Sequence, residues 1–590
     1  MMSTTSRQRN ISFNWIKLAQ YGLIGGIGVL YVCLVGMVEA FDKRDVIGGV
    51  LSLGRALLVV ISLGIGYIAA SRLSGNNAGK AMISGVVVGL MSGVMATILV
   101  LITGPISLRE MFVNASPALI KILTFSQESQ TTGLLMLIGA LTGLSWLGAL
   151  IYLIPPLPRR ILVAGLSAVL LIGMLQELLN VILSQSNLLK SLAGFLFARR
   201  GLSILGTIII FVIFAGLNGL WSTQNQVLKS GVSKLPATQR QTLNWIVILI
   251  GIGLLLVLPQ AVGPYISQVL VLVGLYTLMG LGLNLEIGLA GLLDLGFVGF
   301  FAISAYTVAL FTSTSELGLA SAIANQANGS YSSFWVAIPI AVIVSALAGV
   351  FLGIPVLRTR GDYLAIVTLG LAEIIRILVL SDFLRPVLGG AQGILNIPKP
   401  TVDFLNSVEF ILKDPGHFYY LVLIGCAVLA FIAWRLQNAR IGRNWMAMRE
   451  DEDVAEAMGI NLIASKLLAF GLGAGFAGLS GAIFAAQVGS VFPHSFGLIV
   501  SINVLSLVII GGIGSIPGVI IGALVLVGLP ELLREFSEFR FLIYGALLIV
   551  MMLVKPEGFW PSEVSRRELL EEESQPVEVE TLPASQAQTA

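Results

Sequence analysis

The chain has 590 residues, of which 56% are hydrophobic and only 11% are charged. A soluble domain carries roughly 25% charged residues, so this composition excludes a soluble enzyme, a secreted disulfide scaffold and a disordered regulator. The net charge of +3 is too small to indicate nucleic acid as a partner. The composition predicts a polytopic protein whose main partner is the lipid bilayer.

The apolar residues form separate, continuous blocks. A bilayer core takes about 20 apolar residues per helix, and unpaired backbone groups are too costly in lipid for irregular spans. Strands of a membrane barrel would alternate in polarity, so we expect an all-α bundle of about 16 transmembrane spans. The predicted spans are 18–38, 46–70, 81–104, 132–155, 161–183, 201–221, 244–262, 265–286, 291–312, 334–355, 362–381, 418–434, 465–487, 496–512, 515–530 and 541–555.

Composition also divides the chain into three parts. The stretch 222–243 is largely polar and separates an N-terminal membrane extension, residues 1–240 with about six spans, from a core, residues 241–560 with about ten. The acidic tail, residues 561–590, is expected to be disordered. A Gly-rich turn joins the last two spans before residue 530, which are either two full spans or a re-entrant pair.

Lysine and arginine are more frequent in the segments that face one side of the predicted bundle. The positive-inside rule places these segments in the cytoplasm. We therefore expect a multi-pass protein of the cell inner (plasma) membrane with both termini in the cytoplasm.

Some ionisable residues fall within predicted spans, where each costs about 2.5–3.5 kcal/mol and usually faces a cavity or a partner. Asp294 lies between Gly291 and Gly296, where a broken helix could line a pathway. The alternative is a carboxylate at a helix terminus. Glu373 and Arg376 are three residues apart, which favours an ion pair on one helix face.

A translocation pathway needs polar, small and aromatic groups within the bundle. Asp362 follows a glycine at a predicted span start, where a capping role is favoured over a pathway role. The candidate pathway residues are Asp294, Gly296, Tyr306, Asp362, Tyr363, Thr368, Glu373, Arg376 and Gln392.

The segment 435–464 is the longest charged stretch between two predicted spans on the cytoplasmic side. Its acidic run at Asp451, Glu452 and Asp453 suits the start of a helix, because carboxylates interact favourably with the positive end of the helix dipole. Gly459 suits the end of that helix. This pattern indicates either a short lever helix, over about 450–459, or a solvated connecting loop.

Common catalytic and nucleotide-binding motifs are absent from the sequence. There is no G-x-x-x-x-G-K-[ST] phosphate loop, no HExxH and no CxxC. Gly473-Ala-Gly475-Phe-Ala-Gly478 matches a dinucleotide fingerprint, but it lies inside an apolar block, where small residues favour helix packing. We therefore predict no metal site, no bound cofactor and no enzymatic activity.

Glu456-Ala457-Met458-Gly459 precedes a Gly-rich span and resembles the EAA-type coupling loop of binding-protein-dependent ABC importers. A wider similarity is to the branched-chain amino acid permeases of the LivM kind. It is carried by segments 282–306, 357–376, 389–394 and 504–530, which together cover most of 244–556.

The resemblance implies a transmembrane permease subunit for branched-chain or other neutral amino acids. Its implied partners are cytoplasmic ABC ATPase subunits, which use ATP, a second homologous permease subunit and an extracytoplasmic amino-acid-binding protein. The implied ATPase-coupling residues are Arg449, Glu450, Asp451, Glu452, Glu456, Ala457 and Gly459.

Other functions remain open at the level of sequence. An ion-coupled secondary transporter or channel for a small polar solute would use Asp294 and Glu373 as ion or proton sites. Within the same ABC family, the cargo could be urea or another amide. A membrane-embedded enzyme would need clustered ionisable groups, which two histidines do not supply.

Overall fold

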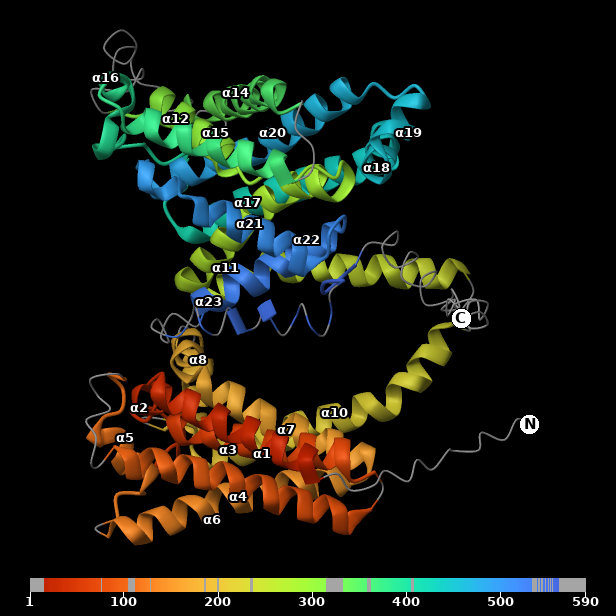
Figure 1. Ribbon diagram of the computed structural model, residues 1–590. Coiled ribbons are helices and arrows are strands. Elements are labelled where there is room, and N and C mark those ends of the chain that lie inside the picture. Colours follow the sequence, from red (N-terminus) through yellow and green to blue (C-terminus); the bar gives the residue numbers. More distant parts are fainter. Residues whose placement is uncertain are drawn as a thin grey trace, which may run out of the picture. The chain divides into compact units, whose positions relative to one another are not determined.

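The computed structural model describes residues 15–75, 77–103, 112–127, 129–184, 187–198, 201–233, 237–314, 333–357, 362–404 and 408–532, and parts of 539–561. The chain divides into two compact units, Met1–Ile250 and Gly251–Ala590 (Figure 1). Both units are built from helices, and the strands in the described ranges form only two short hairpins. The prediction of an all-α membrane bundle is confirmed.

In the first unit, α1, α3, α4 and α6 pack together, and α7 packs against α10. Figure 1 shows α4 and α6 running side by side. Close approach is possible because glycines face backbone: Gly66 of α3 lies against the carbonyl of Ser145, and Gly148 of α6 lies against that of Leu63. The elements are α1 (Trp15–Leu34), α2 (Met37–Phe41), β1 (Asp45–Ile47), β2 (Leu51–Ser52), α3 (Leu53–Leu73), α4 (Ala78–Ile102), α5 (Pro117–Leu123), α6 (Gln130–Leu153), α7 (Pro156–Met174), α8 (Gln176–Leu183), α9 (Asn187–Leu196) and α10 (Ile204–Ser233).

The second unit begins within α11, which kinks at Gly263 between Pro259 and Pro264. The elements are α11 (Ala237–Asn284), the π-helical turn η2 (Leu285–Leu289), α12 (Val298–Thr312), α14 (Ser333–Val356), α15 (Asp362–Leu380), α16 (Arg385–Leu388), η3 (Gly390–Gln392), β3 (Thr401–Phe404), β4 (Val408–Ile411), α17 (Pro415–Asn438), α18 (Arg440–Glu450), α19 (Glu452–Ala457), α20 (Leu462–Val488), η4 (Pro493–Phe496), α21 (Leu498–Gly511), α22 (Ile516–Ala523), η5 (Leu524–Gly528) and α23 (Leu529–Leu532).

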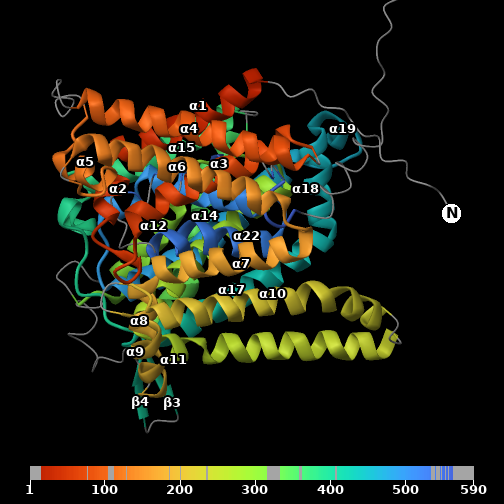
Figure 2. The ribbon, with the colours of Figure 1, turned by 90° about the horizontal axis from the view of Figure 1, so that it is seen from below.

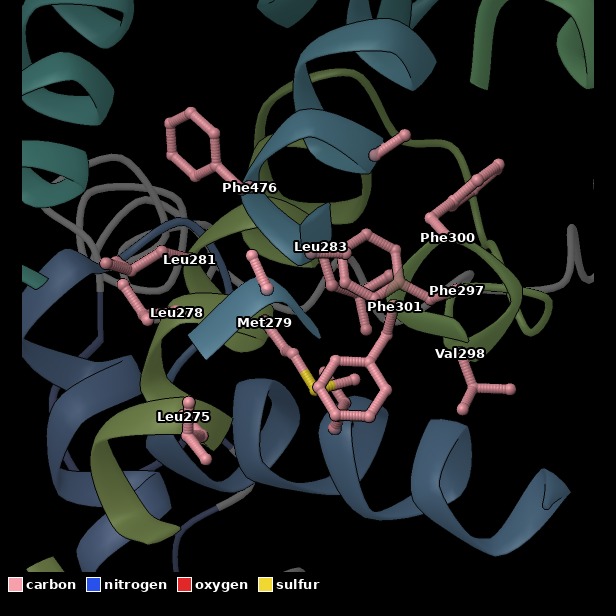
Figure 3. Packing of buried hydrophobic residues seen from close by; sticks show 14 of the residues in the cluster. Leu275, Leu278, Met279, Leu281, Leu283, Phe297, Val298, Phe300, Phe301 and Phe476 are labelled. Carbon is pink, nitrogen blue, oxygen red and sulfur yellow. The ribbon is translucent and has the colours of Figure 1, made fainter. Parts of the chain in front are cut away.

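Helix α20 is the centre of the second unit and packs against α12 and α14. Its Gly471 and Gly475 face Val350 and Ala346 of α14, which confirms the predicted packing role of these glycines. Next to this contact, aromatic side chains of α12 and α20 fill the core beside the last turns of α11 (Figure 3).

Exchanging Gly481 of α20 for Val is expected to destabilise this core. A Cβ at Gly481 would lie 2.2 Å from the carbonyl oxygen of Phe301, so α20 and α12 must separate. Overpacking of this kind costs about 1–3 kcal/mol, and the thermal unfolding midpoint in detergent should fall by several degrees. Gly370→Val is the matched control, because no atom lies within 4 Å of a Cβ built there. Equal midpoints for the two variants would contradict the packing role.

The described residues do not confirm the exact count of 16 spans. Within the described residues, twelve helices are long and apolar enough to cross a membrane, and two shorter apolar helices, Val298–Thr312 and Ile516–Leu532, accompany them. The predicted spans 244–262 and 265–286 are the two arms of kinked α11. The predicted span 291–312 starts late, because helix resumes only at Val298. The predicted span 541–555 lies mostly outside the described residues.

Two features mark opposite ends of the second unit. Helices α18 and α19 lie at one end, and the short helix α16 lies at the other (Figures 1 and 2). The β3–β4 hairpin is also remote from α18 and α19 in Figure 2. The α18–α19 helix pair is therefore remote from the β3–β4 hairpin and from α16.

Candidate functional site

The membrane segment that begins with α11 is broken. After Asn284 the chain forms the π-helical turn η2, then runs without helical structure from Gly291, which has a φ of +72°, to the start of α12 at Val298. π-Helical turns often mark functional positions. Irregular backbone at membrane depth is tolerated only where protein or a water-filled cavity surrounds it. The break is therefore a candidate site.

Side chains from two other helices hold the far edge of the break. The amide of Leu295 donates to Thr368 Oγ1 of α15 at 3.1 Å, and the amide of Val298 donates to Ser501 Oγ of α21 at 3.1 Å. These bonds satisfy amides at and before the start of α12 that lack helical partners. Gly296 approaches the backbone of Thr368 so closely that a Cβ would lie 2.1 Å from its carbonyl oxygen. The break is thus fastened to α15 and α21.

Two acidic side chains are buried at the break. Glu286 is 0% exposed and Asp294 is 1% exposed. Asp294 Oδ1 accepts a hydrogen bond from the amide of Gly296 at 2.6 Å. Within the described residues, Asp294 Oδ2 and both carboxyl oxygens of Glu286 have no hydrogen-bond partner. Buried carboxyl groups of this kind are either protonated or matched to a cationic group.

Glu286 is the site residue that sequence reasoning missed. Its position at the end of a predicted span suggested nothing more than a residue near the membrane surface. Glu286 fits because Gly473 of α20 has no side chain: a Cβ there would lie 1.9 Å from Glu286 Oε1. The sequence signal was an acidic residue between Gly282 and Gly291 in a Gly-rich apolar block.

Two small cavities follow the seam between α12 and α15. Asp294, Gly296 and Thr368 line the first, and Tyr306 and Arg376 line the second. Both cavities are bounded by the shared residues Ala372 and Ile375, and each measures about 10 Å³, close to the room that one water needs. Five predicted pathway residues are therefore gathered along one seam, which is too narrow here for an amino acid.

Three other pathway candidates, Glu373, Tyr363 and Gln392, do not line these two cavities. Arg376 Nε donates to Glu373 Oε1 at 3.0 Å, which confirms the predicted ion pair within α15. Tyr363 is 75% exposed, and Gln392 in η3 is also exposed. Asp362 begins α15, but its side chain lies outside the described residues, so the predicted cap stays a prediction.

The short helix expected over about 450–459 is present as α19, and a second helix, α18, precedes it within the charged segment. Helix α18 ends at Glu450 and α19 begins at Glu452 because the Asp451 carboxylate caps the second helix. Its Oδ1 accepts from the amides of Asp453 and Val454 at 2.9 and 3.0 Å. Gly459, with a φ of +87°, turns the chain after α19. The predicted acidic start and glycine stop are confirmed, and the capping interaction separates the helices.

Three contacts join α18 and α19 to the rest of the second unit. Glu452 pairs with the buried Lys466 of α20 at 2.7 Å, and the fully buried Trp445 donates its indole N–H to the carbonyl of Ser465 at 2.9 Å. The Arg449 guanidinium donates to the carbonyl of Gly288 in η2 at 2.8 Å. Sequence reasoning selected Glu452 and Arg449 but missed Lys466 and Trp445, whose partners are distant in the chain.

The outer face of α19 is apolar and uncovered. Val454 is 58% exposed and Met458 is 78% exposed, and they are four residues apart on one face. Glu450, Glu456 and Ala457 are also exposed. Val454 and Met458 therefore form a small exposed apolar spot among charged side chains.

A partly buried cation, Lys399, lies before β3, outside the α18–α19 pair. Lys399 donates to the carbonyls of Ala486 and Gln487 at the end of α20, where the helix dipole favours a cation. Its ammonium lies 5.2 Å from the centre of the Phe418 ring. Burial lowers the pKa of Lys399 below its ordinary value.

In the described part of the chain, no three His, Cys, Asp or Glu side chains gather as metal ligands. A helical bundle with a broken, buried segment and acidic groups at the break has the architecture of a membrane transport protein.

Comparisons with known proteins identify the family. Residues 265–554 match the family described as branched-chain amino acid transport system / permease component. The chain is 42% identical to the high-affinity branched-chain amino acid transport system permease protein LivM of Salmonella typhimurium over 49% of this chain and 68% of the relative. It is 40% identical to LivM of Escherichia coli over 55% of this chain and 77% of the relative.

A third relative, the permease protein LivH of Salmonella typhimurium, is 28% identical over 32% of this chain and 63% of its own length. No solved structure matches the chain. The chain belongs to the branched-chain amino acid transport system permease family and is a transport component rather than an enzyme.

Proposed function

We propose that the chain is the transmembrane permease subunit of an ABC importer for branched-chain or other neutral amino acids in the cell inner membrane. The family and the relatives called LivM support this proposal. The observation that carries it is the uncovered apolar face of α19 on a helix pair fastened to the broken segment. This face is the docking surface for a cytoplasmic ATPase, which supplies the ATP-driven movement.

The cargo passes along the seam between α12 and α15 when the bundle opens. A neutral amino acid carries opposite charges that cancel, so it needs a weakly polar path with few fixed charges. Gly296 and Thr368 at the first cavity and Tyr306 at the second supply weakly polar lining, and Asp294 and Arg376 add one ionisable side chain to each cavity. Because both cavities are small, the described conformation is closed, and transport requires a second state.

Two further partners complete the proposed assembly. Similarity to both LivM and LivH supports pairing with a second, homologous permease subunit. An extracytoplasmic amino-acid-binding protein delivers the cargo to the end opposite α19. Both termini then lie in the cytoplasm, and the chain itself binds no cofactor. The role of the extension, residues 1–240, stays without an assignment.

One observation favours a second function, an ion-coupled transporter. Glu286 and Asp294 are buried carboxyl groups with free acceptor oxygens among the described residues, which is typical of a proton or ion site. The two functions differ in their energy source, so a single transport measurement separates them.

Leucine uptake into proteoliposomes that contain the complete transporter is expected to need ATP and to survive ionophores that collapse ion gradients. A Val454→Asp, Met458→Asp double variant should lose ATPase association and uptake together, because it places charge on the docking face. Phe383→Asp is the matched control: Phe383 is also exposed but lies next to α16, at the opposite end. Uptake that follows an ion gradient without ATP would refute the importer, and normal ATPase association of the double variant would refute the docking surface.

A further inference from the structure

We infer that Arg449 is a positioning residue. It transmits movement of the α18–α19 helix pair to the non-helical break between η2 and α12, where Glu286 and Asp294 are buried. This inference rests on the proposed docking of an ATPase at α19. The inference is that the Arg449 side chain connects the α19 docking surface to the break between η2 and α12.

The connection begins with a hydrogen bond between distant parts of the chain. Arg449 Nη1 donates to the carbonyl oxygen of Gly288 at 2.8 Å, across 161 residues of sequence. Gly288 lies in the π-helical turn that carries Glu286, only two residues away. In such a turn the regular helical hydrogen-bond pattern is interrupted, so an external donor has an available carbonyl to hold.

The stem of Arg449 adds a steric contact to this bond. A Cβ at Gly291 would lie 2.8 Å from Arg449 Cγ and 3.2 Å from its Cβ, so the side chain rests directly on the glycine backbone. Gly291 has a φ of +72° and is where the chain leaves the helical path. Arg449 therefore contacts the turn at two points: it bonds to Gly288 within η2 and packs on Gly291 just after it.

The other contacts of the helix pair lead to a different element. Lys466 and Ser465, which bind Glu452 and Trp445, both belong to α20. They make α18, α19 and the start of α20 move as one body. The Arg449 side chain is the part of this helix pair that hydrogen-bonds to η2, at the edge of the break. A displacement of this body would thus act on η2 through Arg449, and on Glu286 next to it.

The turn η2 is also held at its N-terminal end, so movement of the helix pair can change the conformation of the residues after it. The amide of Gly514 donates to Asn284 Oδ1 at 2.7 Å, which ties the last residue of α11 to the loop between α21 and α22. A displacement of Gly288 by Arg449 is therefore resisted by Asn284, which is held in place one helical turn earlier. The expected result is a change in the conformation of residues 285–297, where Glu286 and Asp294 lie.

The test is the ratio of leucine transported to ATP hydrolysed, measured on the complete transporter in proteoliposomes. Arg449→Ala is expected to keep ATPase association and ATP hydrolysis while the ratio falls about tenfold, a difference of ~1.4 kcal/mol in coupling. Arg449→Lys, which keeps the charge and one donor, should give an intermediate ratio and serves if the Ala variant folds poorly. Arg443→Ala is the matched control, because Arg443 of the same helix is exposed and donates only to the nearby carbonyl of Asn438.

Each outcome has one meaning. An unchanged ratio in Arg449→Ala, or a Lys variant as poor as Ala, would overturn the inference. Loss of ATPase association in Arg449→Ala would also overturn it, because Arg449 would then be part of the docking surface. If the unmodified transporter moves leucine without an ATPase, the proposed function fails instead, before any variant is compared.

Discussion

Glu286→Gln is expected to reduce leucine uptake about tenfold, or ~1.4 kcal/mol, while folding and ATPase association stay normal. The amide has the shape of the carboxyl group, so it fits the space left by Gly473. The amide can neither ionise nor release a proton, so it removes both properties that the carboxyl group brings to the break. A group that is fully buried and costly to ionise is retained in membrane proteins mainly where it has a task.

The measurement is initial-rate uptake in proteoliposomes, with protein yield and ATP hydrolysis recorded for the same samples. Asp294→Asn should also reduce uptake without loss of expression, because Asp294 lies at the same break and lines the first cavity. Asp382→Asn is the control, since the Asp382 carboxylate is almost fully exposed. Unchanged uptake in both Glu286→Gln and Asp294→Asn would mean that these carboxyl groups only stabilise the fold.

A charge exchange between Glu452 and Lys466 is expected to give the second large effect. Lys466→Glu alone places two carboxylates together at a mostly buried position, and Glu452→Lys alone places two ammonium groups there. Breaking a buried ion pair costs about 3–5 kcal/mol. Each single variant should therefore detach α19 from α20 and reduce ATPase association and uptake by more than tenfold.

The double variant Glu452→Lys, Lys466→Glu restores opposite charges and should recover a large part of both activities. The same exchange at Asp382 and Arg385 is the control: that pair is 3.9 Å apart and exposed, so its two single variants should change little. If the double variant is no better than the worse single variant, the contact between Glu452 and Lys466 does not hold the helix pair in place.

The site shows where reasoning along the chain succeeds and where it fails. Asp294 was identified because placing a carboxylate within an apolar membrane block costs free energy, however the helices are arranged, and glycines flank this one. Glu286 was missed because its burial depends on Gly473, 187 residues later, which leaves space for the carboxyl group. The ion pair of Lys466 was not predicted, because its partner Glu452 lies in a separate short helix earlier in the chain.

The sequence alone determined the helical membrane bundle, the family resemblance, the glycine packing of α20 and the start and stop of α19. These properties depend on composition and on residues close together in the chain. Only the tertiary structure decided where the transport segment breaks, which five pathway candidates share a seam, and how Arg449 reaches Gly288. Those features arise from contacts between helices, and the position of one helix on another is set by the packing of distant side chains, which local patterns do not contain.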